Sequence, residues 1–400
     1  MKILLGVPEY PPYHIGGGGE VFKQLAENYK KMGHEVVVMY GYYPTKSWRD
    51  EVREYRDKNG IKFFQIPEIP YPKSASFLRT VMPVNFRTWK KIKLILTKEK
   101  PDVAHLHGYG LLFVNQLARA LQNCKIKYLL TLHGAPVSPG KMGGITGLLY
   151  YFYKLLPGRA LLENADEITA VSEYTKTFSE FKKFAEKIIV INNGIDVDEF
   201  ANFQPTNNPY KKFIKVGNDK EFIFLSLGRI EWLKGFQFFI KIIPDLVKMG
   251  YNPKYFIAGR DNGMKKELLT LIEKVKLEKN VFFLGQLDSE AKKNALYYTD
   301  FVIVPSLVEN FPAVPLEAMA FGKIPIINDA GGMPEMIVNN VNGIVVEVEK
   351  RKKFIGVIKK LLEEKKTDEM EKRNLRKIRK RSWVEISEKY LERLKRVFFN

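Results

Sequence analysis

The 400-residue sequence holds a single cysteine, Cys124, so it cannot form an internal disulfide. A lone thiol fits a reducing compartment and is more often a small buried hydrophobic side chain than a nucleophile. No apolar run approaches the ~20 residues that a membrane-spanning helix requires. The N-terminus leads directly into a strand-like stretch without a cleavable signal pattern. We therefore expect a cytoplasmic protein.

Acidic residues are also scarce relative to basic ones, with 45 Asp and Glu against 65 Lys and Arg and a net charge of +20. Residues 350–400 alone carry 19 Lys and Arg and 8 Asp and Glu, a pattern typical of solvated helix faces. Nucleic acid, anionic phospholipid and nucleotide phosphate are all anions that such a chain would attract. Because the basic residues are scattered and no nucleic-acid-binding module is recognised, we expect no nucleic-acid partner.

Short runs of Val, Ile and Leu alternate with helical patterns along the chain. Strands are predicted at residues 2–7, 36–40, 103–106, 128–132, 168–171, 188–191, 222–227, 254–258, 280–284, 301–304, 324–327 and 343–346. Continuous apolar runs between helices predict parallel sheets covered by helices on both faces. Two groups of six strands are separated by residues 198–220, which are rich in Asn, Pro and Lys and form the predicted linker. The prediction is an α/β protein with domains at 1–200 and 201–380 and a C-terminal helix at 381–400.

Four glycines at residues 16–19 precede a helical pattern after the first predicted strand. Gly17 and Gly18 would let backbone N–H groups approach an anion at the helix N-terminus. A dinucleotide site would need the tighter G-x-G-x-x-G spacing and an acidic residue at the end of the second strand. That strand ends Val38-Met-Tyr-Gly-Tyr42, without a carboxylate, so an NAD-dependent enzyme is disfavoured.

The second half of the chain has charged residues directly after two predicted strands. Arg229 and Lys234 follow strand 222–227, and two cations at the carboxyl edge of a sheet are suited to binding a diphosphate. Glu309 and Glu317, eight positions apart, follow strand 301–304. Proline at 315 suits the first turn of a helix, in which Glu317 is expected to lie. The N-terminus of that helix would favour the same phosphates.

In these motifs the chain resembles the GT-B glycosyltransferases of family four, a large family of retaining enzymes, over essentially its whole length. The matching segments are the glycine loop, Thr131-Leu-His-Gly134, Ala170-Val-Ser-Glu-Tyr-Thr175, Asn192-Asn-Gly-Ile-Asp196, Gly228-Arg229, Lys234-Gly235, Glu309 with Glu317, and Gly331-Gly-Met-Pro-Glu335. The resemblance implies a GT-B fold, in which two Rossmann-like, doubly wound domains face a cleft. It further implies that the N-terminal domain binds the acceptor, that the C-terminal domain binds a nucleotide-sugar donor, and that the last helix packs back on the N-terminal domain.

The resemblance also assigns roles to individual residues. Arg229 and Lys234 would hold the donor diphosphate, and Glu317 would accept hydrogen bonds from the ribose. Glu309 and His133 would lie beside the donor sugar, where His133 positions a hydroxyl group rather than acting as the general base. The expected catalytic residues are His133, Arg229, Lys234 and Glu309, and the expected donor-binding residues are Gly17, Gly18, Arg229, Lys234, Arg260, Asn310, Phe311, Ala313, Val314 and Glu317.

The sequence departs from the family where many members carry glycine and this chain has Pro312. Proline has no N–H to donate, so backbone donors would come from Phe311, Ala313 or Val314. Asp196-Val-Asp198 imitates a metal-binding Asp-x-Asp motif, but its neighbours match the interdomain segment of family four. We therefore expect no catalytic metal and no cofactor, with the nucleotide-diphosphate sugar as co-substrate.

The acceptor is expected to be a glycan, a lipid-linked group or a small molecule. Residues 86–96 and 147–156 combine basic and aromatic side chains, which suits peripheral contact with an anionic membrane on its cytoplasmic face. The same patterns fit ordinary amphipathic helices equally well. A catalytically silent GT-B-like protein and a basic nucleic-acid- or membrane-binding protein remain alternatives.

Overall fold

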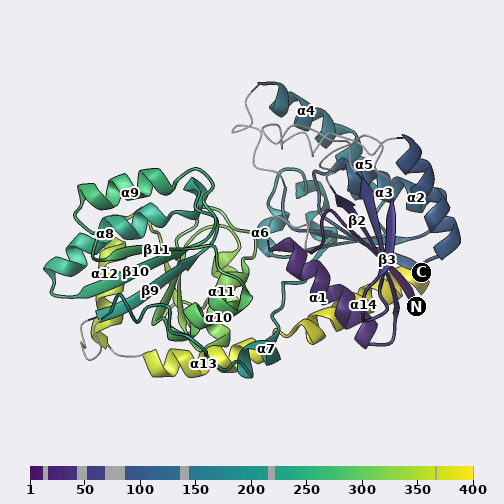
Figure 1. Cartoon of the computed structure of the whole chain (residues 1–400). Coiled ribbons are helices and arrows are strands. Elements are labelled where there is room, and N and C mark those ends of the chain that lie inside the picture. The colour runs from purple at the N-terminus through teal and green to yellow at the C-terminus, as the bar shows by residue number, and fades with distance from the viewer. Residues whose placement is uncertain are drawn as a thin grey trace. The chain divides into compact units, whose positions relative to one another are not determined.

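A computed structural model of the chain describes residues 1–11, 17–42, 52–67, 86–135, 144–214, 221–364 and 367–399. The chain forms two compact units (Figure 1). Unit 1 comprises Met1–Gly194 together with Trp383–Asn400, and unit 2 comprises Ile195–Ser382. All of the predicted strands are present, each within a residue or two of its expected bounds.

Unit 1 is built on an eight-stranded sheet in the order β3-β4-β2-β1-β5-β6-β7-β8. The strands are β1 (Lys2–Val7), β2 (Glu35–Tyr42), β3 (Arg53–Arg56), β4 (Lys62–Pro67), β5 (Val103–His107), β6 (Tyr128–Leu132), β7 (Glu167–Ala170) and β8 (Ile188–Val190). All neighbours are parallel except β3 and β4, which are antiparallel. The chain winds outward from β1 in one direction and from β5 in the other, so the strand order reverses between β1 and β5.

Helices cover both faces of this sheet because its side chains alternate between two cores. Leu4 packs in a core with residues of α2, α3 and α5, whereas Ile3 and Leu5 pack on the other face with residues of α1 and α14. The helix α14 lies beside α1 (Figure 1). The helices are α1 (Gly18–Lys31), α2 (Phe86–Glu99), α3 (Leu112–Asn123), α4 (Gly144–Leu155), α5 (Pro157–Glu163), α6 (Glu173–Lys176) and α14 (Trp383–Phe399), with a 3-10 helix at Lys182–Lys187.

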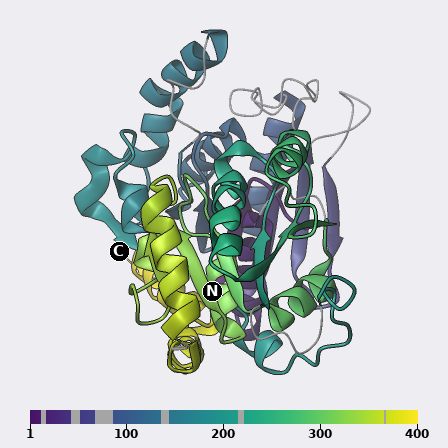
Figure 2. The same cartoon turned by 90° about the vertical axis from the view of Figure 1, so that its left-hand side faces the viewer.

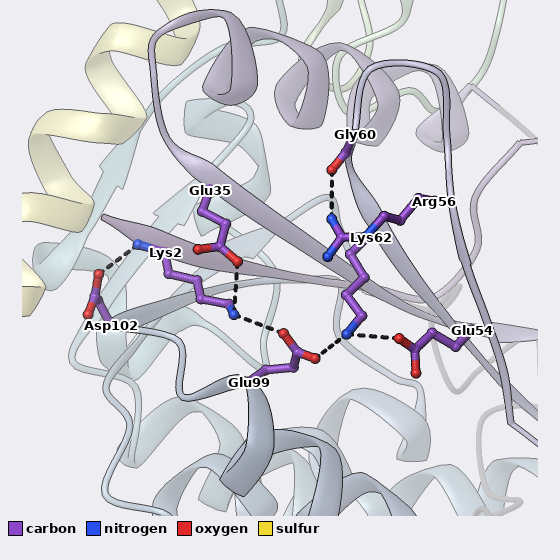
Figure 3. Close-up of polar contacts among 8 residues, drawn as sticks. All are labelled: Lys2, Glu35, Glu54, Arg56, Gly60, Lys62, Glu99 and Asp102. Atoms are coloured by element: carbon purple, nitrogen blue, oxygen red, sulfur yellow. Dashed lines mark hydrogen bonds and ion pairs between the residues drawn. The ribbon is translucent and has the colours of Figure 1, made fainter.

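A chain of ion pairs ties together the edge of this sheet where its parallel strands begin (Figure 3). Glu99, at the end of α2, accepts from Lys2 at 2.8 Å and also pairs with Lys62. Lys62 reaches Glu54 at 2.8 Å, and Lys2 reaches Glu35 at 2.9 Å. Burial opposes ionisation of Glu99, but the hydrogen bonds and charges of both lysines outweigh it and lower the pKa of its carboxyl group. The network therefore joins β1, β4 and α2 at the edge opposite the strands' carboxyl ends.

Unit 2 has a six-stranded, entirely parallel sheet in the order β11-β10-β9-β12-β13-β14. Its strands are β9 (Glu221–Leu227), β10 (Asn252–Ala258), β11 (Val281–Gly285), β12 (Phe301–Val304), β13 (Ile324–Asn328) and β14 (Ile344–Val346). This is the Rossmann order 3-2-1-4-5-6, with the reversal between β9 and β12.

Consecutive residues of β10 show how this sheet is covered on both faces. Tyr255 contacts Phe239 of α8 at 4.8 Å between ring centroids, and Phe256 contacts Tyr210 at 4.4 Å on the opposite face. Helix α12 lies beside α8 (Figure 2). The helices are α7 (Val197–Ala201), α8 (Phe236–Lys248), α9 (Lys265–Lys274), α10 (Ser289–Tyr298), α11 (Ala313–Ala320), α12 (Arg351–Glu364) and α13 (Thr367–Arg379), with 3-10 helices η4 (Trp232–Lys234) and η5 (Met333–Glu335).

Two features of the fold differ from the sequence prediction. Strands β3 and β4 were not predicted. β3 reads Arg-Glu-Tyr-Arg and is exposed along its whole length, whereas β4 is buried along its whole length and its Phe-Phe-Gln-Ile run was an overlooked signal. The expected linker is wrong for residues 198–214, which belong to unit 2. There Tyr210 is fully buried and its hydroxyl donates to the carbonyl of Ala295 at 2.8 Å. Residues 215–220 lie outside the described part of the chain.

Candidate functional site

The strand-order reversal in unit 2 places the two predicted cations on one loop. Arg229 follows β9 directly, and its exposed guanidinium lies 3.0 Å from Oε1 of Glu231. Lys234 ends the short helix η4 and is about four-fifths buried, with 21% of its side chain exposed. Its ammonium forms an ion pair with Glu309, which follows β12 and is 17% exposed. The structure thus brings Lys234 and Glu309 together across the two strands that flank the reversal.

Two glycines allow the loops that carry these residues to pack closely. Gly235 has φ +70°, and a Cβ there would collide with the carbonyl oxygen of Pro305. Gly331 has φ +63°, and a Cβ there would collide with the carbonyl oxygen of Glu309. The backbone N–H of Gly332 donates to that same oxygen at 2.8 Å. The backbone of Glu309 is therefore held by the loop that follows β13.

The loop after β10 is hydrogen-bonded through its backbone to the loop after β9, which carries Arg229 and Lys234. The N–H of Ile230 donates to the carbonyl of Arg260 at 2.8 Å, and the N–H of Gly228 donates to that of Ala258 at 2.9 Å. Arg260 has an exposed side chain. Its position next to the Arg229 loop is compatible with the nucleotide contact expected from the sequence.

Helix α11 begins at Ala313, with Pro312 as its N-cap residue and without a side-chain cap. The donors expected from Ala313 and Val314 thus lie at the helix N-terminus, where backbone N–H groups have no intrahelical acceptor. Asn310 and Phe311 precede it, and Phe311 is buried beneath the guanidinium of Arg381, 5.5 Å from the ring centroid.

Glu317 lies in the second turn of α11, not the first as expected, because the helix begins two residues before Pro315. Its Oε1 accepts from Nζ of Lys292 on α10 at 2.7 Å. Lys292 was not predicted, because no sequence motif distinguishes it among 65 lysines and arginines. Lys292 fixes the Glu317 carboxylate on the side of α11 that faces α10.

In unit 1, helix α1 and His133 meet through the ring of Phe22. Gly17 is the N-cap of α1 and Gly18 its first residue, while residues 12–16 lie outside the described chain. One turn along α1, the Phe22 ring lies 5.5 Å from that of His133 and 5.0 Å from that of His107. His133 is half-buried directly after β6, and burial lowers its pKa to about 4. It is therefore neutral near pH 7.

Two further histidines behind His133 were not predicted. His107 ends β5, and its Nδ1 lies 2.9 Å from Nε2 of His133. His105 is hydrogen-bonded at both nitrogens, to the hydroxyl of Tyr29 at 2.9 Å and to that of Thr131 at 2.7 Å. Burial, and secondarily the charge of His133, lowers the pKa of His105 to about 3. The sequence feature that could have indicated these two histidines is their His-x-His spacing at the end of β5, next to the strand-order reversal.

Asp196 has a structural role. Its side chain caps α7 by accepting from the N–H of Glu199 at 3.0 Å. Among the described residues, no group of three or more His, Cys, Asp or Glu side chains is arranged to hold a metal ion.

The two basic and aromatic stretches differ in the structure. Helix α2 buries Ile92 and Leu96 in the core of unit 1. Among its described residues, Leu94 is the large apolar side chain that is exposed. This is the pattern of an amphipathic surface helix. Helix α4 instead exposes a row of apolar side chains on the face away from the core: Leu148 (56%), Tyr151, Phe152 (52%) and Leu155, continued by Leu156. No described helix is long and apolar enough to cross a membrane.

Comparison with known proteins finds two families along the chain. Residues 15–199 match the Glycosyltransferase Family 4 model, and residues 208–378 match that of Glycosyl transferases group 1. An uncharacterized glycosyltransferase of Methanocaldococcus jannaschii is 31% identical over 352 residues, 86% of this chain and 85% of the relative. The GPI3 subunit of phosphatidylinositol N-acetylglucosaminyltransferase from Saccharomyces cerevisiae is 25% identical over 83% of this chain and 68% of its own length.

Solved structures share the fold over almost the whole chain. HepE of Anabaena in complex with UDP superposes with a TM-score of 0.73 at 20% identity, covering 99% of this chain and 100% of HepE. Sucrose-phosphate synthase of Thermosynechococcus elongatus gives 0.74 at 16% identity, covering 100% of both chains. Two parallel-sheet Rossmann-like units in one chain are the GT-B fold, as the sequence predicted.

Proposed function

The chain belongs to the group 1 glycosyltransferases, and on that premise we propose that it transfers a hexosyl group from a nucleoside-diphosphate sugar with retention of anomeric configuration. The observation that carries the proposal is the placement of Arg229, Lys234 and Glu309 at the strand-order reversal of unit 2. Ligands of open α/β sheets bind outside the carboxyl ends of the strands at this reversal.

The donor diphosphate would bind Arg229 and Lys234. A charge pair near 4 Å contributes about 4 kcal/mol at an effective dielectric constant of 20, before desolvation costs. A diphosphate at Lys234 competes with Glu309 for the ammonium, and the displaced Glu309 carboxylate is then available to a sugar hydroxyl. Negative charge on the phosphate grows as the glycosidic bond breaks, so the attraction to both cations is greater in the transition state. This charge neutralisation makes the proposed reaction independent of a metal ion.

The nucleoside would extend along α11, with its ribose at Glu317. Lys292 holds one carboxylate oxygen of Glu317 at 2.7 Å, which orients the other toward a ribose hydroxyl. Arg260, Asn310 and Phe311 belong to loops at the same sheet edge and complete the proposed donor-binding residues of unit 2.

The acceptor would bind unit 1, and we propose a lipid-linked or glycan acceptor brought to the enzyme at an anionic membrane. The exposed apolar row of α4 lies on the same helix as Lys154, so this helix combines apolar insertion with a cation that anionic headgroups attract. The single cysteine supports action in the reducing cytoplasm.

A panel of sugar nucleotides, screened by thermal stabilisation, tests the proposed function. A donor present at 100 times its Kd stabilises the protein by about 2.7 kcal/mol, so one base and sugar should raise the melting temperature more than the others. Proton NMR of the product formed from that donor should show the same anomeric configuration as the donor, with activity unchanged by a chelator. An inverted product, loss of activity in the chelator, or no stabilisation by any sugar nucleotide would contradict the proposal.

A further inference from the structure

Helix α4 of unit 1 has two faces of opposite character. Two of its tyrosines, Tyr150 and Tyr153, are 1% and 3% exposed and pack into the core of the unit. The large apolar side chains around them are exposed and recur at helical spacing, and we call them the outer row: Leu148, Tyr151, Phe152 and Leu155. The helix therefore connects an exposed apolar surface, at the margin of unit 1, with buried contacts inside the unit (Figure 1).

An anionic membrane is the partner that suits the outer row. A second copy of the chain would bring two net charges of +20 together, whereas an anionic surface is attracted by the same charge. The row also combines leucine with phenylalanine and tyrosine, a composition typical of helices that lie at the interface of a membrane. Charge and composition thus favour a membrane over a second copy of the chain.

The buried face of α4 holds the loop that follows β5. The hydroxyl oxygen of Tyr153 accepts from the backbone N–H of Gly110 at 2.9 Å, and the same hydroxyl donates to Oδ1 of Asn115 at 2.8 Å. The Tyr153 ring also packs edge-on against the ring of Tyr109, at 5.4 Å between centroids. Tyr153 thereby fixes the loop both to α4 and, through Asn115, to α3.

The loop that Tyr153 holds has little rigidity of its own. Gly108 and Gly110 have φ +97° and +89°, and glycine leaves the backbone more conformational freedom than any other residue. The loop begins directly after β5, next to the reversal between β1 and β5, where ligands of open α/β sheets bind. Contacts from outside the loop, that of Tyr153 among them, therefore determine how well it is ordered at the ligand-binding edge of the sheet.

We propose that α4 couples membrane contact to the order of the loop after β5, with Tyr153 as the positioning residue that connects the two. Burial of the outer row in the membrane restrains α4. Because its hydroxyl is bonded to the Gly110 amide, Tyr153 transmits that restraint to the loop. The inference rests on the membrane contact in the proposed function and adds that anionic lipid activates the enzyme.

Hydrogen exchange of the full chain, followed by mass spectrometry of peptides that contain Gly110, tests the coupling without any substrate. Vesicles of phosphatidylglycerol and phosphatidylcholine should slow exchange at Gly110 by about 3- to 10-fold in the wild type, and vesicles of phosphatidylcholine alone should not. Unchanged exchange in protein that floats with the anionic vesicles, or no flotation at all, would overturn the proposal. Sedimentation as a dimer that dissociates when the outer row is replaced with serine would identify a second copy as the partner and would also overturn it.

Two phenylalanine variants of α4 separate the coupling from a general loss of packing. Tyr153→Phe removes the hydroxyl that holds Gly110, so exchange there should be about 3- to 10-fold faster without vesicles, and anionic vesicles should slow it by less than about twofold. Tyr150→Phe is the matched control, since it removes a hydroxyl of the same buried face that contacts Glu180 at 3.3 Å instead of the loop. Both variants should float as the wild type does. A full vesicle effect in Tyr153→Phe, or an equal loss of it in Tyr150→Phe, would contradict the role of Tyr153.

Turnover of the sugar nucleotide that stabilises the protein most separates this inference from the proposed function. Anionic vesicles should raise kcat by about 3- to 10-fold in the wild type and Tyr150→Phe, and by less than about twofold in Tyr153→Phe. The Kd for the nucleoside diphosphate should be the same in all three proteins. Equal stimulation of the two variants would contradict the proposal. If the wild type turns over no sugar nucleotide, the proposed function fails while hydrogen exchange still decides the coupling.

Discussion

The ion pair between Lys234 and Glu309 sets the electrostatics of the donor site at the level of single residues. Both side chains are largely buried, and each neutralises the other. A diphosphate that binds the Lys234 ammonium must displace the Glu309 carboxylate from it. The same carboxylate that competes with the nucleotide is the one proposed to hold the sugar, so its removal should affect binding and turnover in opposite directions.

Glu309→Gln should therefore raise the affinity for a nucleoside diphosphate by about 3- to 10-fold, or ~1 kcal/mol, while lowering kcat. The amide keeps the shape of the side chain but no longer neutralises Lys234. Isothermal titration calorimetry measures the affinity, and Glu163→Gln, which breaks an exposed ion pair with Arg159, is the matched control. A Glu309→Gln variant that binds the nucleotide more weakly than the wild type would contradict this assignment.

Some residues around the site could not be predicted from the sequence. Lys234 and Glu309 form a specific motif after buried strands, so their proximity at one sheet edge could be predicted. The importance of Lys292 could not be predicted, because it comes only from the ion pair that Lys292 on α10 forms with Glu317 on α11. His107 was missed because a histidine at the end of a strand is ambiguous until its partner ring, which is 26 positions away, is placed.

At the level of elements, the loops after β9, β12 and β13 form one assembly joined by backbone hydrogen bonds. Gly331→Ala should destabilise it by about 1–3 kcal/mol, because alanine at φ +63° is strained and its Cβ meets the Glu309 carbonyl. The kcat of Gly331→Ala should also be lower than that of the wild type. Gly356→Ala, in the interior of α12 with open space around it, should instead stabilise by about 0.5–1 kcal/mol. Chemical denaturation measures the free energy of unfolding of the two variants. Equal changes in that free energy would contradict the close packing of Gly331 against Glu309.

The ion-pair network at the opposite edge of unit 1 makes its stability depend on pH. The pKa of Glu99 is lower in the folded state than in the unfolded chain, so its contribution is complete above the unfolded value and is lost as pH falls below it. Glu99→Gln should cost about 1–3 kcal/mol near pH 7, because Lys62 and Lys2 lose their shared, largely buried partner and keep only the more exposed Glu54 and Glu35. The difference from wild type should shrink in acid, and a constant difference down to pH 3 would contradict the network.

Most elements could be predicted because buried parallel strands have continuous apolar sequences. β3 could not, because it is an exposed edge strand whose residues carry no apolar pattern. Glu317 was wrongly expected in the first turn of α11 because a proline within the first turn does not fix which residue begins the helix, and the N-cap is Pro312. The linker prediction relied on composition, which could not show that Tyr210 is buried on unit 2.

At the level of the whole molecule, the positive charge and the apolar face of α4 together suggest where the enzyme acts. Replacing Leu148, Tyr151 and Phe152 with serine should reduce flotation with anionic vesicles by about tenfold or more, since each fully buried apolar side chain contributes ~1.5–3 kcal/mol. Leu269→Ser, an exposed apolar residue on unit 2, is the control. Vesicle binding that is unaffected by the α4 substitutions would contradict the proposed membrane contact.

The central claim is that Lys234, with Arg229, binds the diphosphate of the donor. Its most direct test is the Kd of a nucleoside diphosphate and of the corresponding monophosphate, measured by calorimetry for the wild type, Lys234→Ala and the exposed control Lys248→Ala. The wild type and the control should prefer the diphosphate, and Lys234→Ala should lose about tenfold or more of that preference, or ~1.4 kcal/mol. An unchanged preference in Lys234→Ala would contradict the account.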